Sequence, residues 1–283
     1  MPTSRGTHMP LEQQVAAHYT GADRTRAILD ALRAAGLDPD RLSVADLAPV
    51  GEFHIRGREA TVELGQALGL GPHQHVLDVG SGTGGASRHF AFAHGARITG
   101  VDLTAEYCEL AARFARSAGL AERLDYRHGS ALAMPFEDRA FDAAYTQHVA
   151  MNITDKEALY AEVARVLKPG ALFGIYDVLQ GPGGEAVYPM PWANDPSTSF
   201  LATPDEMRRL LEAAAGFRVE SWRDTTAAGQ AFFATVLARI AESGPPPLGL
   251  HLLLPDFRPR AQNMLRGLTE RRLLVVEIVC RKA

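Results

Sequence analysis

The 283-residue chain has a formal net charge of −4, with 46% hydrophobic and 22% charged residues, which predicts a sizeable core and argues against disorder and polyanion binding. Its two cysteines, Cys108 and Cys280, lie far apart without a nearby ligand pattern, which argues against a disulfide framework and against a metal site. Its apolar runs are too short to span a bilayer and its start lacks a secretory signal, so we expect a cytoplasmic protein that neither binds nucleic acid nor inserts into a membrane.

The first 70 residues are interpreted in two parts. Residues 1–10 contain a second methionine and are interpreted as a cloning remnant or a disordered start. Over residues 11–70, apolar side chains recur at helical spacing, as at Ile28 and Leu32, and glycines and a proline at 69–72 end the pattern. We therefore predict an N-terminal helical cap over residues 11–70.

Residues 71–283 are interpreted as the core domain, because short apolar runs alternate there with helical stretches. This pattern predicts a parallel sheet covered by helices on both faces. Thr154 and Thr203 each open a capping-box sequence, the second followed by proline. Between them, residues 180–203 are rich in glycine and proline, which predicts a lid or a substrate loop. The predicted strands are His75–Val79, Arg97–Asp102, Leu124–Arg127, Phe141–Thr146, Ala171–Asp177, Phe217–Trp222 and Leu273–Cys280.

The first predicted strand runs into the glycine-rich turn 80–85, where the backbone can bend sharply and approach a ligand. About 20 residues later the next strand ends at Asp102, a position suited to bind two ribose hydroxyls. Asp78, just before the turn, would repel a pyrophosphate and attract a ligand that carries an ammonium and a sulfonium. The glycine spacing also differs from the G-x-G-x-x-G of dinucleotide folds. A cationic nucleoside is therefore favoured over NAD or FAD.

Residues Val76–Gly85 resemble the first motif of the class I S-adenosylmethionine-dependent methyltransferases. Three later segments are similar to that family in the same order: Asp102-Leu103, Gly129–Phe136 and Val166–Ala171. The resemblance covers residues 70–223. It implies an α/β, Rossmann-like fold with a seven-stranded, mostly parallel sheet whose last strand is antiparallel, and S-adenosylmethionine as the cofactor.

The resemblance also assigns residues to the cofactor. Ser130 stands where the family has an aspartate near the adenine amino group, and its hydroxyl can still hydrogen-bond adenine. The predicted cofactor-binding residues are Asp78, Gly80, Ser81, Gly82, Gly84, Asp102, Leu103, Ser130, Ala131 and Gln147.

The acceptor is expected beside the segment that follows the fourth strand, because in this family it lies next to the transferable methyl group. His148 in that segment is the candidate base. Tyr19 resembles a tyrosine that related enzymes place near the donor, and it is the second catalytic candidate. The predicted substrate-binding residues are His54 in the cap, Asn152, and the loop aromatics Tyr188 and Trp192, whose rings attract methylated ammonium groups.

Segments 151–156 and 188–193 are similar to sarcosine and dimethylglycine N-methyltransferase-like bacterial enzymes. This closer resemblance implies a small amine as the methyl acceptor. Three other readings stay open: C- or O-methylation of a natural-product intermediate, a non-catalytic nucleotide-binding module, and an NAD-dependent oxidoreductase. A small molecule is the expected partner, and a homodimer is left open.

Overall fold

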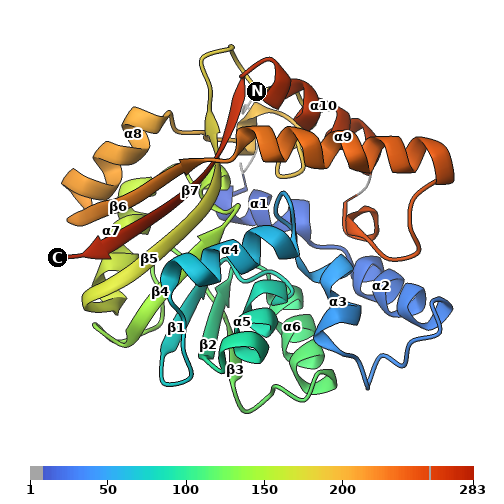
Figure 1. Ribbon diagram of the computed structural model, residues 1–283, viewed down its shortest axis with the longest axis horizontal. Helices are drawn as coiled ribbons and strands as arrows, with labels where there is room; N and C mark the ends of the chain where they lie inside the picture. The colour runs from blue at the N-terminus through green and yellow to red at the C-terminus, as the bar shows by residue number, and fades with distance from the viewer. Residues whose placement is uncertain (1–8, 255) are drawn as a thin grey trace, which may run out of the picture.

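A seven-stranded sheet forms the centre of residues 9–254 and 256–283, the part of the chain that the computed structural model describes (Figure 1). Its strand order is β3-β2-β1-β4-β5-β7-β6. Neighbouring strands among β1 to β5 pair in parallel, whereas β7 runs antiparallel to both β5 and β6. The predicted mostly parallel sheet with a reversed last strand is confirmed. The strands are β1 (His75–Val79), β2 (Arg97–Asp102), β3 (Leu124–His128), β4 (Phe141–Gln147), β5 (Leu167–Gln180), β6 (Phe217–Asp224) and β7 (Leu273–Lys282).

The helices bury apolar residues against this sheet. The segment 1–10 is interpreted above as a cloning remnant or a disordered start, and its residues 1–8 lie outside the described residues. The α-helices are α1 (Leu11–Tyr19), α2 (Ala22–Ala34), α3 (Val44–Gly51), α4 (Arg58–Leu68), α5 (Gly85–His94), α6 (Ala105–Ser117), α7 (Lys156–Val166), α8 (Pro204–Arg209), α9 (Thr226–Ser243) and α10 (Phe257–Thr269). Short helical turns are η1 (Ala150–Asn152), η2 (Pro196–Thr198), η3 (Leu210–Ala214) and η4 (Leu250–Leu252).

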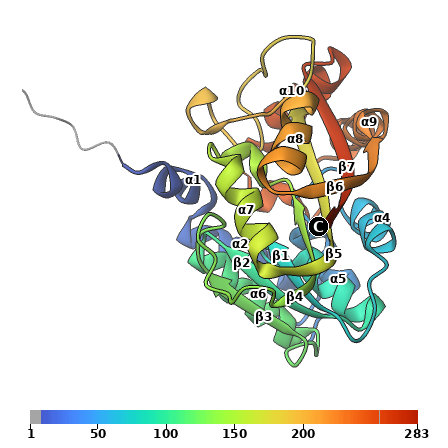
Figure 2. The same cartoon turned by 90° about the vertical axis from the view of Figure 1, so that its left-hand side faces the viewer.

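Helices cover both faces of the sheet, as the parallel strands require. Leu64 of α4 and Phe90 of α5 pack on one face together with residues of α9 and α10. Leu159 of α7 and Leu211 of η3 pack on the other face. Figure 2 shows this division, with α4 and α9 on one side of the sheet and α7 and α8 on the other.

The segment predicted as a helical cap, residues 11–70, contains four helices that pack in different places. α4 contributes to the core on the sheet, whereas Ile28 and Leu32 of α2 pack with Leu47 of α3 and Phe114 of α6 in a separate cluster. α1 lies apart from both, near the carboxyl ends of the strands (Figures 1 and 2). These helices therefore contact the core on the sheet, the helix between β2 and β3, and the strand ends.

One predicted helix start is one residue off. The cap of α7 is Asp155, whose side chain accepts a hydrogen bond from the N–H of Ala158 at 2.9 Å, so Thr154 lies outside the helix. A carboxylate accepts from free helix N–H groups as well as a hydroxyl does. The capping box at Thr203 is confirmed, with Pro204 at the first helical position.

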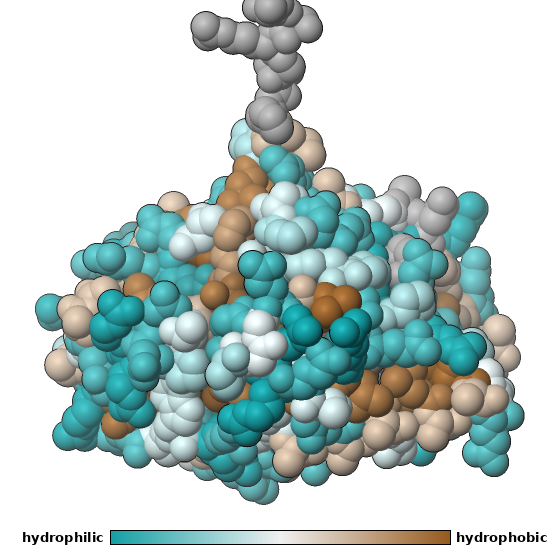
Figure 3. Space-filling view, turned by 90° about the horizontal axis from the view of Figure 1, so that it is seen from above, coloured by the Kyte–Doolittle hydropathy of each residue, from teal (hydrophilic) through white to brown (hydrophobic). Residues whose placement is uncertain are grey.

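The surface is mixed in polarity. Polar residues cover most of the face seen in Figure 3, and hydrophobic residues appear there as separate patches. Across the described ranges, no helix combines the length and the apolar character needed to cross a bilayer.

Candidate active site

The strand order reverses between β1 and β4. β2 and β3 extend the sheet on one side of β1, whereas β4 and β5 extend it on the other. In open α/β sheets, ligands bind outside the carboxyl ends of the strands at such a point. The glycine loop, Asp102 and the segment after β4 all lie at this edge. The fold therefore brings the predicted cofactor and acceptor segments together.

Two glycines of the loop have different tasks. Gly80 has a φ of 76°, and a Cβ atom there would lie 2.3 Å from a methyl group of Val149, so glycine is needed for packing. Gly82 has a φ of 51°, and the nearest atom to a Cβ there would be 3.8 Å away, on Phe53. Gly82 lines the cavity that is described below. A side chain at position 82 would therefore enter space that a ligand can occupy.

The Asp102 carboxylate is fixed by two backbone groups. The N–H of Gly82 donates to Oδ2 and the N–H of Thr104 donates to Oδ1, both at 2.8 Å. Burial raises the pKa of Asp102 above its ordinary value, while these two donors act in the opposite direction. A carboxylate accepts at about four lone-pair sites, so the two backbone donors do not exhaust its capacity for ligand hydroxyls. This arrangement fits the two ribose hydroxyls of S-adenosylmethionine.

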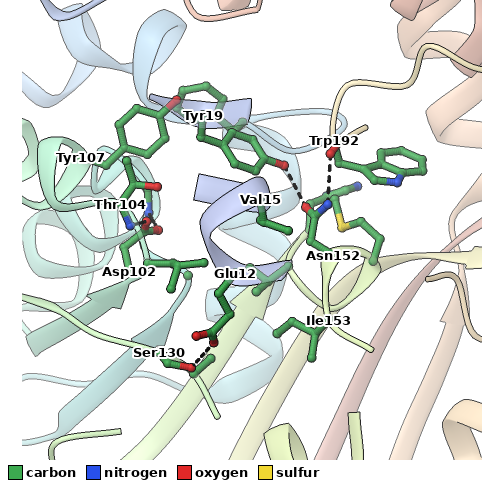
Figure 4. Close-up of a pocket in the computed structure, with 18 of the residues that line it drawn as sticks. Glu12, Val15, Tyr19, Asp102, Thr104, Tyr107, Ser130, Asn152, Ile153 and Trp192 are labelled. Atoms are coloured by element: carbon green, nitrogen blue, oxygen red, sulfur yellow. Dashed lines mark hydrogen bonds between the residues drawn. The ribbon is translucent and has the colours of Figure 1, made fainter. Parts of the chain in front are cut away.

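A cavity of about 180 Å³ extends from Asp102 to the segment after β4. Figure 4 shows α1 crossing it, with Glu12, Val15 and Tyr19 directed into it. The predicted site residues that line it are Tyr19, Gly80, Gly82, Asp102, Leu103, Ser130, Ala131, Gln147, His148, Asn152 and Trp192.

Asn152 joins three segments at one side of the cavity. Its Oδ1 accepts a hydrogen bond from the Tyr19 hydroxyl at 2.9 Å, and its Nδ2 donates to the carbonyl of Trp192 at 3.0 Å (Figure 4). Burial raises the pKa of Tyr19, so the phenol stays protonated. The indole of Trp192 is 2% exposed and its Nε1 donates to Ser199 at 2.8 Å. Asn152 therefore holds the two aromatic residues in place.

His148 borders the cavity with a neutral ring. Among the described residues, neither of its ring nitrogens has a hydrogen-bond partner, although both are buried. Burial, and secondarily the neighbouring His54, hold the pKa of His148 well below 6.5. The rings of His54 and His148 lie 6.1 Å apart, and the ring of Tyr176 lies 5.2 Å from that of His148. A ligand group that meets these nitrogens would satisfy buried polar atoms.

Five predicted site residues lie outside the cavity lining. The Asp78 carboxylate turns toward α5, where it accepts a hydrogen bond from the Ser87 hydroxyl at 2.5 Å, and burial raises its pKa to about 6. The predicted direct contact between Asp78 and the cofactor is therefore not supported. His54 sits behind the lining, with its Nε2 3.3 Å from Nε2 of Gln147. The others are Ser81, Gly84 and Tyr188.

The cavity also contains residues that the sequence reasoning missed. Glu12 and Val15 precede Tyr19 by seven and four residues, and this spacing places all three on one face of α1. That stripe was a signal available in the sequence. Phe53 and Tyr107 also line the cavity with their rings stacked at 5.8 Å, and Leu254 reaches it from the far end of the chain. No local sequence pattern predicts that Leu254 lines this cavity.

No group of three or more His, Cys, Asp or Glu side chains arranged to hold a metal occurs within residues 9–254 and 256–283. The chemistry of the cavity is thus set by Asp102, Glu12, His148 and the phenols and amides around them.

Comparison with known proteins shows which family the central part of the chain matches. Residues 77–175 match a methyltransferase domain family. The chain is 37% identical over 116 residues to a sterol 24-C-methyltransferase of Gibberella zeae, a match that covers 41% of this chain and 30% of that enzyme. It is 32% identical over 177 residues to an O-methyltransferase of Aspergillus sclerotiorum, covering 61% of this chain and 65% of that one. The chain thus spans less than two thirds of these curated relatives.

Solved structures share the whole architecture. A geranyl diphosphate C-methyltransferase from Streptomyces coelicolor A3(2), in complex with Mg²⁺, geranyl diphosphate and S-adenosyl-L-homocysteine, aligns with a TM-score of 0.71 at 20% identity, covering 98% of this chain and 99% of that one. A phosphoethanolamine N-methyltransferase of Haemonchus contortus also has a similar fold, with a TM-score of 0.76 at 16% identity, covering 98% of this chain and 60% of that one. At such identities the likeness shows a common fold.

Proposed function

We propose that the chain is a class I S-adenosylmethionine-dependent methyltransferase that methylates carbon or oxygen in a neutral, largely apolar small molecule. The observation that carries the proposal is the wall around His148. There a neutral imidazole with both nitrogens unpaired among the described residues faces a lining made mostly of apolar and aromatic side chains.

The charges in the cavity favour a neutral acceptor. Among the described lining residues, Asp102 and Glu12 are the carboxylates, and both lie at the end formed by β2 and the segment after β3. The other end holds Tyr19 and Trp192 around Asn152, with apolar neighbours. A protonated amine placed there would lose its hydration without gaining an opposite charge. The two curated relatives named above are a C-methyltransferase and an O-methyltransferase by their names, which agrees with this choice.

The residues supply alignment and a proton acceptor. The methyl donor provides an activated electrophile when bound, so what the chain adds is orientation, exclusion of water and proton removal. Asp102 and the loop backbone at Gly82 hold the nucleoside, while Tyr19 and Trp192 confine the acceptor. For a hydroxyl or enol acceptor, one ring nitrogen of His148 would take the O–H proton as the acceptor oxygen bonds the methyl carbon, whose bond to the donor sulfur breaks and leaves its electron pair on sulfur. For an alkene, the same nitrogen takes the proton from the carbon next to the cation that methylation leaves.

The amine acceptor stays a prediction that one assay separates from this proposal. The purified chain is incubated with deuterated-methyl S-adenosylmethionine and with matched pairs of acceptors, prenyl alcohols or phenols against amines of the same carbon skeleton, and mass spectrometry measures methyl incorporation. We expect incorporation into carbon or oxygen of the neutral members. Preferential labelling of the amines would refute the proposal, and so would a lack of labelling in every compound with a cofactor-bound enzyme.

A matched pair of variants tests whether His148 takes the proton. His148→Gln should lose labelling by about 10²–10⁴-fold, since a glutamine side chain cannot take the proton. His75→Gln is the control, because His75 is likewise a partly buried histidine. Its ring is hydrogen-bonded to Thr99 at 2.8 Å, and it lies at the opposite end of β1 from the cavity. Equal losses in both variants would indicate general damage.

A further inference from the structure

The order of the strand ends determines which end of the cavity takes the nucleobase. Along the edge of the sheet, β4 with His148 is followed by β1 with the glycine loop, β2 with Asp102 and β3 with Ser130 just after it. In a nucleoside, the base and the 5′ substituent leave the ribose in opposite directions. If Asp102 holds the ribose and the methyl group lies beside His148, the base lies at Ser130.

An adenine at that end presents an exocyclic amine, which is a donor and requires an acceptor. The Ser130 hydroxyl is already engaged, because it receives a hydrogen bond from the N–H of Leu132 at 3.0 Å and donates to Oε1 of Glu12. A hydroxyl also carries no charge, so it is a weaker acceptor than a carboxylate. The segment after β3 therefore lacks the carboxylate that this base would use best.

The carboxylate present at this end comes from α1. Glu12 lines the cavity, its Oε1 accepts a hydrogen bond from the Ser130 hydroxyl, and Figure 4 shows the pair on the same side of α1 as Asp102. We propose that Glu12 accepts the hydrogen bond of the adenine amino group, so that a cap helix supplies the base-recognition group that Ser130 does not provide. This inference rests on the proposed cofactor and names a further specificity residue for it.

The contact has a consequence for the acceptor end of the cavity. Glu12, Val15 and Tyr19 share one face of α1, Val15 is buried, and Tyr19 is bound to Asn152 at the acceptor side. Binding of adenine at the first turn thus holds the helix whose last turn forms the acceptor wall. Cofactor binding completes the acceptor site.

The test compares two ligands that differ at the base. S-adenosylhomocysteine carries the amino donor, whereas its 6-deamino (purine) analogue has only a hydrogen on carbon 6 and no donor at this edge, and calorimetry measures the affinity of each. The wild-type chain should prefer the adenosyl ligand by about three- to tenfold. This is less than a buried charge-assisted hydrogen bond would give, because Glu12 is exposed and solvent screens its charge. In Glu12→Ala the preference should fall to near unity. Glu122→Ala removes an equal charge from an exposed position before β3 and should keep the wild-type preference.

The outcomes are separable. A Glu12→Ala variant that keeps the wild-type preference, even with weaker binding of both ligands, overturns the proposed base contact. Failure of the wild-type chain to bind either ligand would instead overturn the proposed function. Hydrogen exchange over residues 11–19 gives the second readout: adding S-adenosylhomocysteine should slow exchange in the wild type and much less in Glu12→Ala, and equal slowing in both would contradict the coupling to α1.

Discussion

Replacing Asp102 with alanine removes the group on which the nucleoside assignment depends. Each ribose hydroxyl bound to a carboxylate contributes roughly 1.5–3 kcal/mol, so losing two such bonds predicts a rise in the dissociation constant of about 10²–10⁴-fold. The lower end is expected if water enters the space that the side chain leaves. The variant also frees the N–H of Gly82, which donates to Asp102 in the wild type, so the loop loses a constraint in the same place.

Isothermal calorimetry with S-adenosylhomocysteine measures this change without turnover. Asp142→Ala is the matched control, because Asp142 likewise accepts a backbone hydrogen bond, from His75 at 2.8 Å, but at the amino-terminal edge of the sheet. It should lose stability and keep its cofactor affinity. An Asp102→Ala chain that is folded by circular dichroism and binds with the wild-type constant would refute the placement of the ribose.

Three further predictions concern the loop, the base and a buried acid. Gly82→Val should weaken cofactor binding by at least about tenfold, since a branched side chain is strained at a φ of 51° and enters the cavity; unchanged affinity by calorimetry would mean that the loop faces elsewhere. Because burial and His54 hold the pKa of His148 well below 6.5, turnover should stay flat from neutral pH down through 6.5 and fall only in more acidic solution; a midpoint near 6.5 would contradict an ordered, desolvated His148. Asp78 has its pKa raised to about 6, above the unfolded value, so its stabilising contribution is complete at acidic pH and is lost as pH rises through 6. Asp78→Asn should therefore gain more in thermal unfolding temperature, relative to wild type, at pH 7 than at pH 5, and an equal difference at both would show that Asp78 is not desolvated.

The sequence determined the sheet and one half of the site. Short apolar runs separated by helical patterns give the parallel strands, because each strand must be buried on both faces. The glycine turn and Asp102 were also evident, since their chemistry depends on neighbours in sequence: a strand end, a tight turn and a helix start. The same holds for the segment after β4, which brings Gln147 and His148 to the strand ends.

Alternation within β1 decided against the predicted role of Asp78. Leu77 and Val79 face the cluster that contains α7, whereas Val76 faces the cluster that contains α5. Side chains alternate along a strand, so Asp78 shares the face of Val76 and its carboxylate points under α5 rather than toward the cavity. The period of the strand could have predicted this direction.

Tertiary structure decided which distant segments complete the cavity. Glu12 meets Ser130 across 118 positions, and Tyr19 meets Asn152 across 133. Neither contact leaves a local signature, because each depends on where α1 packs against the strand ends in the folded chain. The depressed pKa of His148 has the same origin: burial under Tyr176 and His54, which come from β5 and the cap, removes the water that would stabilise its charged form.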